Sequence, residues 1–94
     1  MSALRYAGHD YAMHHADLAI LEEAVLAVFS AGRSLVIVDI EAAVGRVVLP
    51  LSASSPFAFI YSTDFFERAE REIATAEIET ALHGGRLFFN SPDA

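Results

Sequence analysis

The alternation of apolar and polar residues along the chain distinguishes predicted strands from predicted helices. The most apolar stretch is residues 35–51, interrupted by a polar joint at 41–46. Two β-rich runs flanking a short polar segment are typical of a hairpin, here at the centre of a small sheet. We expect strands at 34–41 and 45–51. The second is an edge strand at Pro50 or ends there, because proline has no amide hydrogen to donate.

Shorter runs predict four more strands. Residues 3–14 alternate around a turn at Gly8-His9-Asp10 and predict two of them. Residues 57–61 and 86–90 predict one each. The run at 57–61 places three aromatic side chains on one face: Phe57, Phe59 and Tyr61.

Residues 16–31 have helical periodicity, and Gly32 is expected to end this helix in a left-handed conformation. Its apolar face is formed by five side chains: Leu18, Leu21, Val25, Val28 and Phe29. Glu22 falls at the edge of this face, where a carboxylate has to reach water, meet an arginine or carry a raised pKa. We expect Glu22 to reach solvent or Arg46, with a functional carboxylate as the alternative.

Residues 64–83 also favour a helix, but the phase of their apolar positions changes partway. The apolar positions up to Ile73 and those from Ile78 onward point roughly 120–150° apart around a helix axis. A single straight helix would therefore present two apolar faces and lie between two partners. The favoured alternative is a break near Ala74-Thr75 that starts a second short helix.

These elements predict an α+β fold. It has one antiparallel sheet of about six strands and two or three helices on one face, in the order ββ-α-βββ-α(α)-β. A chain of 94 residues has room for one domain, 1–94. Residues 35–38 are consecutively apolar, which indicates a strand covered on both faces. The helix at 16–31 can cover one face, and the other needs the last helices or another chain.

The composition favours a protein partner. The chain is 54% hydrophobic with a mean hydropathy of +0.39, which is more apolar surface than a small globule is expected to bury. We therefore expect a homodimer, a larger homo-oligomer or a complex with another protein. Seven residues are candidates for the interface: Val36, Val38, Phe57, Phe59, Tyr61, Ile78 and Leu82.

Charge and cysteine content exclude several functions. The net charge is −7 with only six basic residues, so no clustered basic face for direct nucleic-acid binding can be assembled. The acidity leaves open an inhibitor that mimics DNA with the carboxylates of 64–79. The absence of cysteine excludes disulfides and cysteine-based zinc sites. No signal peptide or membrane-spanning segment is expected, which predicts a cytoplasmic protein.

The sequence contains no catalytic or cofactor-binding signature. His14-His15, with Asp10 and Asp17 nearby, could suggest a metal, but neighbouring residues of a strand point to opposite faces. The serines of 52–55 lack an evident base, and no glycine-rich phosphate motif is present. We expect a non-enzymatic interaction or assembly protein without cofactor or metal. The further alternative is an enzyme or small-ligand-binding domain that uses Glu22 or the histidines.

A resemblance is carried by these segments: Leu4-Arg5-Tyr6-Ala7-Gly8, Asp17-Leu18-Ala19 with Leu21, Gly32-Arg33-Ser34-Leu35, Gly45-Arg46, Leu49-Pro50-Leu51, Phe57 with Phe59, and Gly84-Gly85-Arg86-Leu87. Together they resemble a family of small uncharacterised actinobacterial proteins, some of which carry a label taken from ATP-dependent DNA ligases. The resemblance implies the order of elements and an actinobacterial or phage source, and implies no function. This chain lacks the family's basic end of the first helix and the tryptophan of its central strand, so the ligase label finds no support.

Overall fold

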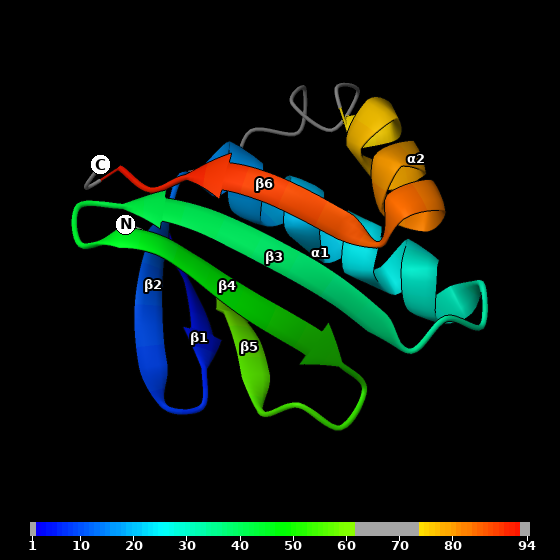
Figure 1. Ribbon diagram of the computed structural model, residues 1–94, viewed down its shortest axis with the longest axis horizontal. Coiled ribbons are helices and arrows are strands. Elements are labelled where there is room, and N and C mark those ends of the chain that lie inside the picture. The colour runs from blue at the N-terminus through cyan, green and yellow to red at the C-terminus, as the bar shows by residue number, and fades with distance from the viewer. Residues whose placement is uncertain (1, 62–73, 93–94) are drawn as a thin grey trace.

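The computed structural model describes residues 2–61 and 74–92, with the side chains of 74–77 excluded. Six strands and two helices follow one another in this part of the chain (Figure 1). They are β1 (Ser2–Tyr6), β2 (His9–Met13), α1 (His15–Ser30), β3 (Leu35–Ala42), β4 (Gly45–Ser52), β5 (Phe57–Ile60), α2 (Ala74–Gly84) and β6 (Arg86–Asn90).

The strands form two sheets of three. One sheet has the order β2-β1-β5 and the other β4-β3-β6. The prediction of an α+β fold with about six strands is confirmed. The prediction of one antiparallel sheet is wrong, because β5 pairs with β1 instead of continuing the sheet of β4, and β6 runs parallel to β3.

The loop between β4 and β5 redirects the chain from one sheet to the other. The backbone amide of Ser55 donates to the carbonyl of Ser52 at 3.0 Å, and the amide of Ser52 donates to the Ser55 hydroxyl at 3.1 Å. The two hydroxyls also lie 2.9 Å apart. These reciprocal bonds close a compact turn, so these two serines have a structural explanation.

The hairpin between β1 and β2 turns at Ala7 and Gly8, with φ angles of 53° and 83°. Two consecutive positive φ angles are typical of a type I′ turn, which suits the twist of a two-residue hairpin. The prediction of a turn at Gly8-His9-Asp10 is therefore wrong at its end. His9 and Asp10 belong to β2, and His9 pairs with Tyr6.

Helix α1 ends as the sequence predicts. Gly32 has a φ of 87°, and the amide of Arg33 donates to the carbonyl of Val28 at 3.1 Å. This is the bond of a Schellman motif, which needs a left-handed residue after the helix.

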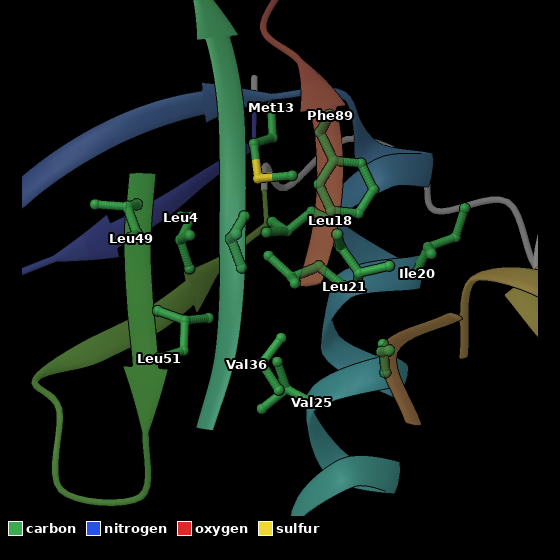
Figure 2. Packing of buried hydrophobic residues seen from close by; sticks show 14 of the residues in the cluster. Leu4, Met13, Leu18, Ile20, Leu21, Val25, Val36, Leu49, Leu51 and Phe89 are labelled. Atoms are coloured by element: carbon green, nitrogen blue, oxygen red, sulfur yellow. The ribbon is translucent and has the colours of Figure 1, made fainter. Parts of the chain in front are cut away.

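The core lies between α1, the inner face of β4-β3-β6 and the sheet β2-β1-β5. Figure 2 shows Leu18, Leu21 and Val25 of α1 on the side of Val36, with Leu4 and Met13 of the other sheet nearby. All six side chains are at most 2% exposed.

Besides its main apolar face, α1 has a second apolar flank that includes Ile20 and Ala24, and α2 covers it. Ile20 and Ala24 of this flank are buried, and so is Ala81 of α2. Ile78 and Leu82 of α2 pack against the same cluster and are half-buried. The two helices thus form one layer behind the sheet.

The described part of helix α2 runs from Ala74 to Gly84, so the predicted break near Ala74-Thr75 lies at the edge of the described residues. The expected helix over 64–73, and with it the question of one helix or two, lies outside the described residues.

The left-handed conformation of Ala7 gives a stability prediction. Replacing Ala7 by asparagine creates the Asn-Gly pair preferred in type I′ turns, and should raise the free energy of unfolding by about 0.5–1 kcal/mol. Urea unfolding measures the change. Ala53→Asn is the control, because Ala53 is also exposed in a turn but does not have a positive φ. An equal gain in both variants would contradict the explanation.

Candidate interaction surface

The outer face of β4-β3-β6 carries two of the large apolar side chains that are exposed in the described chain, Val48 and Phe88. We call it the open face. In Figure 1 the viewer looks onto it, and no described helix or strand lies in front of it. It is formed by alternate residues of the three strands, in register: Pro50, Ile37 and Arg86; Val48, Asp39 and Phe88; Arg46, Glu41 and Asn90.

The middle row of the open face combines two exposed apolar side chains with a covered carboxylate. Phe88 is 49% exposed and Val48 is 48% exposed. Asp39 lies between them in register and is only 2% exposed. A single layer of side chains therefore separates this carboxylate from water.

Asp39 is compensated by Arg86. The guanidinium donates from Nε and Nη2 to the two carboxylate oxygens at 2.5 and 2.7 Å, in a bidentate pair that joins β3 to β6. This hydrogen bonding lowers the pKa of Asp39 below its ordinary value, against the opposing effect of desolvation. The positive charges of Arg86 and Arg46 lower the same pKa further.

Arg46 extends across the sheet instead of pointing away from it. It starts on β4, and its guanidinium carbon lies 5.3 Å from the centre of the Phe88 ring on β6, within the range of a cation–π contact. Its side chain therefore spans the width of the open face. The aliphatic part and the guanidinium of Arg46 help to shield the outer side of β3 from solvent.

An open depression of about 680 Å³ runs along the β6 side of this face. Thr80 and Gly84 of α2 border it together with Arg86 and Phe88, and it reaches Asp39. It therefore connects the open face with the groove between β6 and α2. A depression bounded by an exposed aromatic ring and two arginines can accept apolar and hydrogen-bonding groups of another chain.

A second, smaller cavity of about 210 Å³ lies between β2 and the hairpin of β3 and β4. Its lining is mainly apolar and includes Ile40, Val44 and Val47. The rings of His9 and Tyr11 are 4.6 Å apart at this cavity. It has the size for a small molecule of few atoms, and it is the place that a ligand-binding function would use.

Glu22 accepts a hydrogen bond from the hydroxyl of Tyr61, and both side chains are half-buried. The sequence predicts that Glu22 reaches solvent or Arg46. The contact with Arg46 is wrong, because Arg46 lies on the open face over Phe88, whereas the half-buried Glu22 is still partly open to solvent. The contact joins α1 to the end of β5 and explains a carboxylate at the edge of an apolar stripe. A donor 39 residues away could not be identified from the sequence.

The two histidines also have different surroundings. His14 is exposed before the first residue of α1, and His15 places Nδ1 at 2.7 Å from the hydroxyl of Ser2. Ser2 is only 1% exposed and His15 is half-buried, so this contact joins the start of α1 to β1. Among the described residues no group of three side chains is placed to hold a metal ion.

The interface candidates from the sequence occupy three environments. Val36 and Val38 are fully buried in the monomer, which leaves them no surface for a partner. Phe57, Phe59 and Tyr61 are half-buried against the core, as are Ile78 and Leu82.

Phe88 and Val48, the exposed apolar side chains in the middle row of the open face, were not among these candidates. The sequence does contain a signal for an exposed ring on this strand, the adjacent pair Phe88-Phe89. Adjacent residues of a strand point to opposite faces of the sheet. One of the two rings therefore had to face away from the core. Phe89 is 6% exposed and Phe88 is the outer ring.

Comparisons with protein-family models, with curated proteins and with solved structures gave no match. Neither helix in the described part of the chain combines the length and hydropathy needed to cross a membrane. The open face and the smaller cavity are therefore the features of the described chain that bear on its function.

The pair of Asp39 and Arg86 gives a pH-dependent prediction. A carboxylate whose folded pKa is lowered stabilises the protein fully above its unfolded pKa of about 3.9, and this contribution is lost as the pH falls through the folded pKa. Arg86→Met leaves the covered carboxylate unpaired, so it should lower the free energy of unfolding at neutral pH. The loss should begin to shrink as the pH falls through about 4, and it should disappear only below the lowered folded pKa of Asp39, where the carboxylate is protonated in both proteins.

Urea unfolding at a series of pH values measures this difference. Arg5→Met is the matched control, because it removes the exposed pair of Arg5 and Asp10, which has a 2.7 Å contact. It should have little effect at any pH, since both side chains are about half exposed. Equal decreases in the free energy of unfolding in the two variants would show that the burial of Asp39 does not determine the effect of removing its arginine.

Proposed function

We propose that this chain is a non-enzymatic interaction protein that associates with copies of itself through the open face. The observation that carries the proposal is the pair of exposed apolar side chains, Phe88 and Val48, on a sheet face with no described element over it. Exposed aromatic rings beside arginines are typical of the centres of protein interfaces.

Charge supports this surface over others. A net charge of −7 opposes the approach of two copies. The open face carries two arginines, Arg46 and Arg86, against two carboxylates, Asp39 and Glu41, and is neutral as a whole. Two copies can therefore meet there without the repulsion that the rest of the acidic surface imposes.

The other functional classes have less support. Of the carboxylates expected to imitate DNA, Asp64, Glu67, Glu70 and Glu72 lie outside the described residues. An enzyme that uses Glu22 or His15 has less support because neither side chain lines either of the two cavities described above. The cavity between β2 and the β3–β4 hairpin favours small-ligand binding as the second candidate.

Self-association can be tested by analytical ultracentrifugation over micromolar to millimolar concentrations. The unmodified chain should form dimers or larger species as its concentration rises. Phe88→Thr keeps a strand-forming residue and removes the ring, and should weaken association by about tenfold or more, because half of a phenylalanine side chain is no longer buried in each copy.

The control variant is Leu26→Gln. Leu26 is 58% exposed on α1, so it is at least as accessible as Phe88 but lies away from the open face. It should leave the association constant unchanged. A chain that stays monomeric throughout refutes the proposal, and equal weakening by the two variants refutes the choice of surface.

A further inference from the structure

The free edge of β6 has backbone groups in position for another strand. The amide of Ile37 donates to the carbonyl of Gly85 at 2.7 Å, and the amide of Ser91 donates to the carbonyl of Glu41 at 2.8 Å. In a parallel ladder these two bonds direct the alternate residues of β6 between them toward β3. The amides and carbonyls of the other three residues point away from β3: Arg86, Phe88 and Asn90.

None of these outward groups is bonded by a residue that the structure describes. The open depression also borders this edge, and α2 contributes small residues to it, Thr80 and Gly84. Space is therefore present beside the strand. An accessible row of unpaired amides and carbonyls is a template for pairing with another strand.

We propose that β6 pairs antiparallel with β6 of a second copy, around a two-fold axis at Phe88, to give a continuous six-stranded sheet. This inference rests on the proposed function, namely on self-association and on Phe88 of the open face, whereas Val48 stays at the outer edges of the joined sheet. The occupant is a second copy because the edge is complementary to itself. With the axis at Phe88, this ring faces Phe88 of the partner subunit, and Arg86 faces Asn90 of the partner subunit.

The pairing places no like charges directly opposite each other, and both Phe88 rings lie on the same side of the joined sheet. Each of the three facing pairs can exchange two hydrogen bonds across the axis. Arg46 already rests on Phe88 within its own copy, so the cation–π contact would flank the aromatic pair on both sides. Apolar contact and backbone bonding thus act at the same position.

The opposite edge of this sheet is less suited to the same role. Val48 and Pro50 of β4 occupy outward positions, and Pro50 has no amide hydrogen. The carbonyl of Pro50 is already an acceptor for the Tyr6 hydroxyl at 3.1 Å and the Ser55 hydroxyl at 3.3 Å. A partner strand could bond to the β4 edge only over its first half.

The edge strands of the other sheet are also less suited. The outward positions of β2 include Asp10, whose pair with Arg5 would have to be accommodated beside a second copy. At β5 the amide of Phe57 already donates to the carbonyl of Ser55 at 3.0 Å, so it is not available to a partner strand. Among the strands that the structure describes, β6 offers the outward amides and carbonyls of three alternate residues, Arg86, Phe88 and Asn90.

Single-cysteine variants test the register, because the chain has no cysteine of its own. Phe88→Cys and Val48→Cys introduce spin labels at two positions of nearly equal exposure on the same face. Pairing through β6 places the two 88 positions about 5.5 Å apart and the two 48 positions about 24 Å apart, five strand spacings across the joined sheet. Pulsed and continuous-wave electron paramagnetic resonance measure both distances.

Asn90→Cys provides a second measurement if the loss of Phe88 weakens the dimer. In the proposed register the two 90 positions are about 14 Å apart, offset along the strands on either side of the axis. Close labels at 88 or this separation at 90, together with distant labels at 48, support the inference.

Three results would overturn it. Close labels at 48 with distant labels at 88 would place the contact at β4. Distant labels at all three positions in a chain that associates would place it away from the open face. In the first case the proposed function survives, whereas in the second the chain still self-associates but not through the open face. A chain that remains monomeric in ultracentrifugation at every concentration overturns the register and the proposed function together.

Discussion

The packing of α1 against the inner side chains of β3 is the contact on which the rest of the structure depends. Leu18, Leu21 and Val25 meet Val36 and the other inner residues of β3. Because a strand alternates its side chains, this contact also fixes which residues of β3 face outward. Asp39 points to the open face because Val38 and Ile40 on either side of it point into the core. Arg86 compensates the charge of this covered carboxylate through a bidentate pair.

Local patterns in the sequence were enough to predict the helix α1, its end at Gly32 and the short strands around it. They could not predict the division into two sheets. The pairing of β5 with β1 depends on the turn that the chain makes after Ser52. The pairing of β6 with β3 depends on α2, which precedes β6 and brings the chain back to β3. Hydrophobic alternation carries no information about the partner of an edge strand.

The open face was less predictable than the fold, and the reason is visible in two residues. Asp39 interrupts an apolar run and reads as a solvent-facing position, yet it is covered through a contact with a residue 47 positions away. Phe88 is part of an apolar run and reads as core, yet it is half exposed. Long-range pairing decides both cases, and only the alternation of Phe88-Phe89 hinted at the second.

Most apolar side chains of the described chain are buried inside the monomer, so little apolar surface is left for an interface. Contacts of another kind are therefore needed to hold two copies together. Phe88 and Val48 together expose on the order of 200 Å² of apolar surface, no more than many monomers expose on a single patch. Such an area is too small to hold two copies by hydrophobic contact alone, since specific interfaces bury about 800 Å² on each side. Directional bonding at a strand edge is the element that can supplement it. β6 is the strand that offers such bonding next to the exposed ring, whereas Pro50 and the hydroxyl of Tyr6 restrict the edge beside Val48.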